Sequence, residues 1–317
     1  KFISLLMLLY AGNASLSSFK YSLFIDIVKK LKQWSQSAGN AFIQSGTSET
    51  IRNNTEHVIN ISIHVPTHLR LLNDEQFGHY LAGLIDGDGH FSSQQQLIIV
   101  FTHLDAPLAY YIKSKIGYGN VRKVKDKNAF LYIISNKDGL LKAIRLINNK
   151  LRTINKYNQV INILNNTKYS IGVPHNIKFY LNKTNDFNNH WLAGFSDADA
   201  SFQVKIINRI TRSKPEIRLN FQIDQKDNNL LLIVRNLLGG NIGYRKSKDT
   251  YYYGSTSFGS ARKVIKYFDN YHLQSSKYSN YLKWRKIYIM IQNREHLTEI
   301  GINKISRLKE SMNDGSV

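Results

Sequence analysis

Two stretches of the sequence repeat one another and decide the fold. Residues 79–91 read HYLAGLIDGDGHF, and residues 190–202 read HWLAGFSDADASF. Seven positions are identical, and each lies 111 residues from its counterpart. The similarity continues downstream, where GNV at 119–121 matches GNI at 240–242. A repeat of this length indicates two homologous domains in one chain.

The repeat sets the expected domain boundaries. The first domain is predicted over residues 74–172, the linker over residues 173–185 and the second domain over residues 186–317. Residues 1–73 have no counterpart in the repeat and include a polar stretch, residues 35–60, that is rich in Ser, Asn, Gly and Thr. We therefore expect an N-terminal extension that is weakly ordered or derived from a precursor.

Composition indicates a polyanionic partner and excludes several classes of site. The 317 residues include 43 Lys and Arg against 22 Asp and Glu, a net charge of +21. Such an excess favours nucleic acid or an anionic membrane surface as the partner. The absence of cysteine excludes disulfides, cysteine nucleophiles, iron–sulfur clusters and Cys-type zinc sites. The many Asn, Ile, Lys and Tyr residues have AT-rich codons, as in an organelle genome.

The N-terminal extension contains two apolar segments. Phe2–Tyr10 is too short to span a bilayer and is either a targeting segment or an ordinary helix. Leu16–Trp34 is a second possible helix. A basic protein held at a membrane by Phe2–Tyr10 is one hypothesis, but most of the excess charge lies elsewhere, so no stable membrane partner is expected.

Each domain shows the same order of predicted elements: helix, two strands, helix, two strands, helix. Strand signals are clearest in the second copy, where residues 201–206 and 217–224 alternate strictly between apolar and polar side chains. Residues 230–238 are an apolar helical run. This order predicts an α+β fold made of two pseudo-symmetric domains.

Small residues recur at helical spacing in both motifs. Gly83 and Gly87 are four residues apart, as are Gly194 and Ala198. This spacing places both small residues on one face of a helix, and such faces allow two helices to approach closely. The two motif helices are therefore predicted to pack against each other through these four positions.

The acids that end the motifs predict a metal site. Asp88 and Asp199 fall at helix C-termini, where the macrodipole is negative, and two such carboxylates brought together repel one another. A divalent cation such as Mg²⁺ offsets this and, bound between carboxylates and phosphate, promotes phosphodiester cleavage. In the alternative interpretation, the acids simply end a helix before a turn. A calcium-binding EF-hand loop is excluded, because Leu97 stands where Glu is required.

The predicted strands offer a polar face suited to DNA. Polar side chains alternate with apolar ones, and Arg, Asn, Gln and Lys suit base edges in the major groove. A merely solvated sheet face is the alternative. The first copy carries no basic residue in its hairpin, residues 91–102, so it depends on Gln94–Gln96 and later basic residues. The residues predicted to bind DNA are Ser201, Gln203, Lys205, Arg218, Asn220, Gln222, Arg122, Lys123, Lys125, Arg245 and Lys246.

With LAGLIDGDG at 81–89 and LAGFSDADA at 192–200, the chain resembles the LAGLIDADG homing endonucleases over residues 74–317. The resemblance implies two αββαββα domains, an interface made by the motif helices and a DNA-binding saddle of two four-stranded sheets. It also implies that Asp88 and Asp199 bind Mg²⁺ at the scissile phosphates, and that Mn²⁺ can substitute for Mg²⁺. The other motif acids, Asp86 and Asp197, are then structural.

The resemblance further implies residues that support catalysis. A polar side chain at the end of the second strand corresponds to Gln225 and His103, and a basic residue after the fourth strand corresponds to Lys277 and Lys156. Alternatively, the two lysines are solvated or contact phosphate groups, and His103 is an ordinary polar residue at a strand end. Ala200 departs from the final glycine of the motif.

Two functions follow from the resemblance. The first is site-specific double-strand DNA cleavage by a monomer, which promotes intron mobility. The second is a maturase that binds its own group I intron RNA and assists its splicing, with or without cleavage. The positive net charge suits binding of either DNA or RNA, while the presence of both Asp88 and Asp199 favours cleavage. The expected location is the mitochondrial matrix, with another organelle as the alternative.

Overall fold

The computed structural model describes residues 60–165, 177–210 and 214–312. The chain divides into two units, residues 1–47 and residues 48–317, and every described residue belongs to the second. The segments Phe2–Tyr10 and Leu16–Trp34 lie outside the described residues. None of the helices within the described ranges is both long and apolar enough to cross a membrane.

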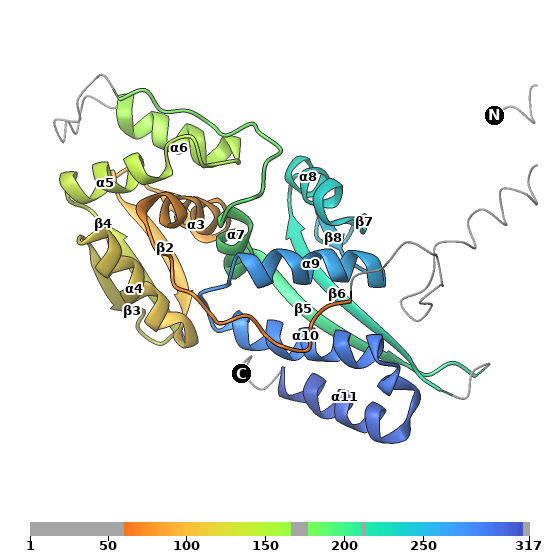
Figure 1. The fold of residues 1–317 in the computed structure, drawn as a ribbon. Coiled ribbons are helices and arrows are strands. Elements are labelled where there is room, and N and C mark those ends of the chain that lie inside the picture. The colour runs from red at the N-terminus through yellow and green to blue at the C-terminus, as the bar shows by residue number, and fades with distance from the viewer. Residues whose placement is uncertain (1–59, 166–176, 211–213, 313–317) are drawn as a thin grey trace, which may run out of the picture. The chain divides into compact units, whose positions relative to one another are not determined.

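The first half of the described chain begins with the helix that carries the first motif (Figure 1). Its elements in order are α3 (Asp74–Asp88), β1 (Gly89–Phe91), β2 (Leu97–Thr102), the 3-10 helix η1 (His103–Asp105), α4 (Ala106–Ile116), β3 (Asn120–Lys123), β4 (Ala129–Ile134), α5 (Lys137–Ile147) and α6 (Ile154–Asn165).

The second half repeats this order and continues beyond it. Its elements are α7 (Trp191–Asp199), β5 (Ala200–Ile207), β6 (Glu216–Gln225), α8 (Asn229–Leu238), β7 (Asn241–Arg245), β8 (Thr250–Gly254), α9 (Phe258–Asn270), α10 (Lys277–Gln292), the 3-10 helix η2 (Glu295–Leu297) and α11 (Glu299–Ser311).

Each half contains one antiparallel sheet with the same topology. The strand orders are β1-β2-β4-β3 and β5-β6-β8-β7, so the strand that follows the motif helix is an edge strand in both sheets. Because order and pairing repeat, the two halves have the same αββαββα arrangement. The predicted fold class, α+β with two pseudo-symmetric domains, is confirmed.

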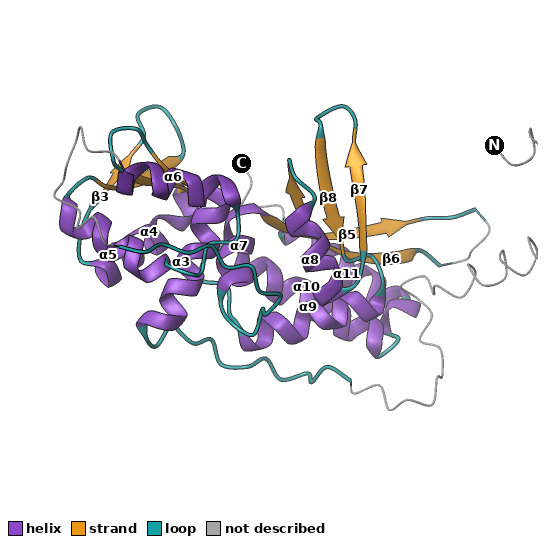
Figure 2. Cartoon of the chain, turned by 90° about the horizontal axis from the view of Figure 1, so that it is seen from above, coloured by secondary structure: helices purple, strands orange, loops and turns teal. Residues whose placement is uncertain are grey.

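Each sheet covers the hydrophobic core with one face. On β6 the alternate residues Ile217, Leu219, Phe221 and Ile223 are all buried, as the period of two requires. Trp284 of α10 lies against this face with its indole bonded to the carbonyl oxygen of Gln203. In Figure 2 the strands β7 and β8 stand to one side of helices α9 and α10, which leaves the opposite sheet face free of them.

The motif helix α3 starts and stops for local reasons. The side chain of Asn73 accepts a hydrogen bond from the backbone N–H of Gln76, which caps the first turn. Asp74 and Glu75 follow, where the positive end of the helix dipole favours acids. The helix ends at Gly89, where the backbone becomes extended and β1 begins.

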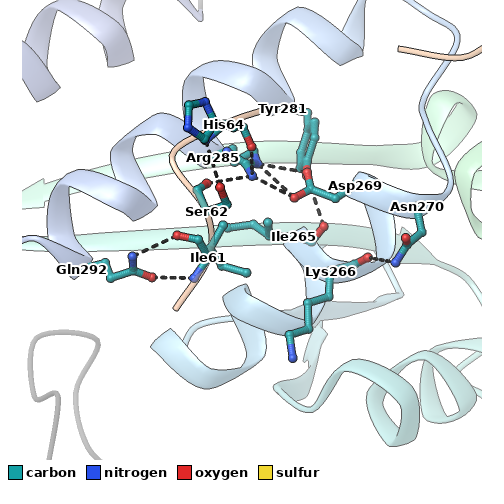
Figure 3. A network of polar contacts seen from close by, with 10 residues as sticks. All are labelled: Ile61, Ser62, His64, Ile265, Lys266, Asp269, Asn270, Tyr281, Arg285 and Gln292. Carbon is teal, nitrogen blue, oxygen red and sulfur yellow. Dashed lines mark hydrogen bonds and ion pairs between the residues drawn. The ribbon is translucent and has the colours of Figure 1, made fainter. Parts of the chain in front are cut away.

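Residues 60–73, the described part of the predicted N-terminal extension, contact the second half of the chain. Ile61 and Leu71 are buried, and the guanidinium of Arg285 donates to the carbonyl oxygens of Ser62 and His64 (Figure 3). This segment, orange in Figure 1, runs along α10. Its backbone finds partners on α10, which local composition does not reveal.

Candidate active site at the ends of the paired motif helices

The motif helices α3 and α7 lie side by side in backbone contact (Figure 1). A Cβ atom added at Gly83 would collide with the carbonyl oxygen of Trp191, and one added at Gly194 with that of Tyr80. A Cβ atom at Gly87 would overlap the methyl group of Ala198. The four small residues therefore lie where the sequence places them, between the two helices.

This close approach brings the final motif acids together. Asp88 and Asp199 are the last residues of α3 and α7. A Cβ atom at Gly87 would lie only 3.2 Å from Oδ2 of Asp199, so the Asp199 carboxylate reaches across to the end of α3. The two carboxylates thus share one region beside the helix interface.

The two carboxylates also interact electrostatically. Burial and then the charge of Asp199 raise the pKa of Asp88, which reaches about 6. Burial also raises the pKa of Asp199. Lys277 and Lys156 lower both pKa values, but not enough to cancel these effects. The site therefore favours an additional positive charge.

Two lysines lie against the ends of the motif helices. Nζ of Lys277 donates hydrogen bonds of 2.6 Å to the carbonyl oxygen of Ala198 and 3.2 Å to that of Ser196. Nζ of Lys156 donates to the carbonyl oxygen of Gly89. Burial lowers the pKa of both lysines, while the nearby aspartates oppose the shift. Each lysine therefore offsets the negative pole of a helix end.

Each strand-end residue shares a cavity with one of these lysines. Gln225 donates a 2.7 Å hydrogen bond to Oδ2 of Asp199 and lines a cavity of about 530 Å³ together with Lys156. His103, in η1 directly after β2, is exposed and lines a second cavity of about 570 Å³ together with Lys277. In both cavities the strand end of one domain therefore meets the helix start of the other.

The other two motif acids, Asp86 and Asp197, have a different environment. Asp86 is buried and accepts hydrogen bonds from the backbone N–H groups of Arg152 and Thr153 and from the Thr153 hydroxyl. Asp197 is buried and accepts from the backbone N–H groups of Gln274 and Ser275 and from the Ser275 hydroxyl. These contacts hold the segments that lead into α6 and α10.

The carboxylate oxygens of Asp88 and Asp199 suit a hard divalent cation. Carboxylate oxygens are the ligands that Mg²⁺ prefers, and this ion keeps several waters. Within the residues that the structure describes, no three His, Asp or Glu side chains gather as a metal-binding cluster. Asp88 and Asp199 would thus supply two ligands, and water and a substrate phosphate would complete the coordination.

On the second sheet, the predicted DNA-binding side chains point away from the core. Ser201 and Lys205 are exposed, and Gln203 and Gln222 are half-buried. Asn220 differs from expectation: it is only 8% exposed. Its amide donates to the side-chain oxygens of Gln203 and Gln222. Asn220 therefore orients its neighbours on this face.

Acidic side chains neutralise part of the predicted basic surface. Arg218 is paired with the buried Glu216, which also binds Arg209 at 2.8 Å. Arg245 bonds Asp224 at 3.1 Å. Glu216 and Arg218 lie two residues apart on one face of β6, whereas the pairs of Arg209 with Glu216 and of Arg245 with Asp224 join separate segments and become visible only in the folded sheet. The remaining predicted residues, Arg122, Lys123, Lys125 and Lys246, are exposed.

Comparisons with known proteins agree with this geometry. A sequence profile described as LAGLIDADG endonuclease matches residues 192–288, which include the second motif but not the first. An uncharacterized 37.2 kDa protein of cox1 intron 2 in Schizosaccharomyces pombe is 60% identical over 316 residues, covering 96% of this chain and 97% of that protein.

Two relatives from Saccharomyces cerevisiae carry functional names. The intron-encoded DNA endonuclease aI3 is 30% identical over 275 residues, or 70% of this chain and 65% of the relative. The intron-encoded RNA maturase bI4 is 28% identical over 223 residues, or 66% of this chain and 33% of the relative. The chain therefore spans from a third to about two thirds of these two relatives.

Among solved structures, I-SmaMI bound to an uncleaved DNA target with calcium ions has the same fold. It aligns with a TM-score of 0.59 and 24% identity, covering 77% of this chain and 99% of that one. The meganuclease I-CpaMI bound to uncleaved DNA aligns with a TM-score of 0.61 and 22% identity.

Proposed function

The chain belongs to the LAGLIDADG homing endonuclease family, and from this we propose that it is a site-specific double-strand DNA endonuclease that promotes mobility of an intron. The observation that carries the proposal is the pairing of Asp88 and Asp199 at the abutting ends of α3 and α7. An accidental helix end would not place two acids together against their own repulsion.

The proposed chemistry is phosphodiester hydrolysis. Mg²⁺ held by Asp88 and Asp199 would activate water and stabilise the charge of the displaced oxygen. Gln225 fixes the orientation of the Asp199 carboxylate through its 2.7 Å hydrogen bond. Lys156 and Lys277, whose pKa values are lowered by burial, face the same acids and would hold a proton or a phosphate oxygen beside them.

The proposed partner is a double-stranded DNA site bound by one copy of the chain. Both halves of the αββαββα pair are present in a single polypeptide, so a second copy is not needed to bring two acids together. The DNA target bound to I-SmaMI, which shares this fold, supports DNA as the ligand. A mitochondrial location is proposed from the cox1 intron of the first relative.

The test is cleavage of an uninterrupted intron-insertion site. Wild-type protein with Mg²⁺ or Mn²⁺ should cut both strands, and the Asp88→Asn, Asp199→Asn double variant should bind the same DNA without cutting it. The matched control is Asp138→Asn, an exposed acid in the first turn of α5, which should cut. Cleavage by the double variant at the wild-type rate would contradict the assignment of the acids.

A second candidate function is assistance to splicing of its own group I intron. The relative named RNA maturase bI4, which aligns with 66% of this chain, favours it. Splicing of the host intron in vitro separates the two functions, because a maturase role should survive Asp88→Asn and Asp199→Asn while cleavage is lost. Splicing that is unaffected by adding the protein would contradict the maturase role.

A further inference from the structure

The outer face of the first sheet is aliphatic. In β2 the residues Leu97, Ile99 and Phe101 are buried in the core, so Ile98 and Val100 between them point to the opposite face. The register pairs Ile98 with Ile133 and Val100 with Leu131. Val100 is 42% exposed, and the other three are half-buried. Four adjacent aliphatic side chains therefore form one accessible patch.

The corresponding positions of the second sheet are polar. The repeat aligns His103, just after β2, with Gln225 at the end of β6. Counted back from these residues, Ile98 corresponds to Asn220 and Val100 to Gln222. Asn220 and Gln222 belong to a network of hydrogen-bonding side chains. The two sheets thus present different chemistry at the same positions.

Basic residues border the aliphatic patch. Arg122 of β3 pairs with Leu131 of β4 and is exposed. Lys125 and Lys127, in the turn that follows β3, are exposed as well. A protein surface that binds another protein through an apolar centre is depleted in lysine. A lysine- and arginine-rich border around the patch instead favours a nucleic acid whose phosphates meet the basic residues.

Duplex DNA has one apolar group that such a patch fits. Each thymine exposes a C5-methyl group in the major groove, and aliphatic side chains recognise it by contact, whereas Asn and Gln bond base edges. We propose that the first sheet recognises its half of the target through thymine methyl groups, and that the second sheet recognises its half by hydrogen bonds. This inference rests on the proposed endonuclease function.

The experiment begins with the target itself. Selection from random duplex DNA without Mg²⁺ gives the preferred sequence, and addition of Mg²⁺ shows whether it is cut. The chain has no cysteine, so a single Lys125→Cys variant, in the exposed turn after β3, carrying an iron chelate that generates hydroxyl radicals marks the half-site under the first sheet. Thymines in that half-site are then replaced one at a time by uracil, which removes only the methyl group.

Binding and cleavage of these duplexes test the inference. Each methyl group buried by the first sheet should contribute about fourfold in affinity, the value of one buried methyl. Replacement of thymines in the other half-site should have smaller effects. The variant Ile98→Asn, Val100→Gln, which copies the second sheet, should lose this sensitivity to uracil while its thermal unfolding stays close to that of the wild type.

The outcomes separate this inference from the proposed function. If the protein selects and cuts a site but uracil in the first half-site changes nothing, the methyl-recognition inference fails and the endonuclease function stands. If no sequence is enriched, both fail. If Ile98→Asn, Val100→Gln changes the oligomeric state in gel filtration and uracil has no effect, the patch binds a second copy and the inference is overturned.

Discussion

The indole N–H of Trp191, on α7, donates a 2.8 Å hydrogen bond to Oδ2 of Asp86, on α3. The reciprocal contact is present, because the hydroxyl of Tyr80 on α3 donates a 2.6 Å hydrogen bond to Oδ2 of Asp197 on α7. Tyr80 and Trp191 occupy the same position in the two repeats. Each motif helix therefore supplies an aromatic donor to the buried acid of the other.

This relationship predicts that Asp86→Asn destabilises the protein without directly touching the metal site. Both Asp86 oxygens accept hydrogen bonds from donors, among them Trp191 and the backbone N–H groups of Arg152 and Thr153. An asparagine NH₂ group would face a donor, and a buried unsatisfied pair costs about 1–3 kcal/mol. Chemical denaturation should show this loss. The matched variant Asp88→Asn removes the repulsion from Asp199 and should be at least as stable as the wild type; equal losses in both variants would contradict the distinction.

The close contact between α3 and α7 predicts that one added methyl group strongly destabilises the fold. Gly194→Ala would place its Cβ atom against the carbonyl oxygen of Tyr80, so the two helices would have to separate, with an expected loss of about 3 kcal/mol. The control is Gly259→Ala in the first turn of α9, where a Cβ atom meets nothing within 4 Å and alanine should not destabilise the fold. Similar unfolding midpoints for the two variants would exclude the close contact.

Much of this fold could be predicted from the motif. The four-residue spacing of Gly83 with Gly87 and of Gly194 with Ala198 implies a small-residue face, and a helix pair is the simplest way to bury two such faces. Strand alternation at residues 217–224 implies a half-buried strand. These signals are local, so they are visible without knowledge of what each element contacts.

Other parts of the site depend on contacts between distant elements. Asn220 is buried because Gln203 lies opposite it in the register, and a single strand does not reveal its partner. Likewise, the hydrogen bond that Trp191 donates to Asp86 depends on how the two motif helices are rotated about their axes. The segment at residues 60–73 contacts α10, more than 200 residues away, which composition cannot indicate.

The lysines predict a loss of cleavage that depends on position. Lys277→Met removes the cation beside Asp88 and Asp199 and should lower the cleavage rate by about 100-fold, as expected for a group that assists proton transfer. Lys286→Met, at an exposed position on the same helix, is the control and should cleave normally. Single-turnover cleavage measures both variants. Retained activity in Lys277→Met would leave the lysine with only a structural role.

Arg285 should anchor residues 61–64 to α10 (Figure 3). It is 2% exposed and forms a 2.9 Å ion pair with Asp269 in addition to its bonds to Ser62 and His64. Arg285→Gln would leave buried acceptors unpaired, and breaking such a pair costs about 3–5 kcal/mol. Hydrogen exchange at residues 61–64 should accelerate as well. Unchanged exchange there, with lower global stability, would restrict the role of Arg285 to the pair with Asp269.

A final prediction concerns pH. Burial, together with the charges of His272 and His79, lowers the pKa of His190 to about 4. The unfolded chain binds a proton at this residue near the ordinary value of 6.5, and the folded chain does not. Between these two pKa values the unfolded state therefore binds more protons, so stability rises with pH across this window and is lost as pH falls through it.

The size of the effect is limited because His190 is only partly buried. After allowance for solvent screening, we expect about 1–2 kcal/mol less stability from His190 at pH 4.5 than at pH 7. The variant His190→Gln cannot bind this proton, so its unfolding free energy should fall less over the same range. His90→Gln, at an exposed position, should follow the wild type. A His190→Gln curve parallel to that of the wild type would show that His190 is not the group that destabilises the fold in acid.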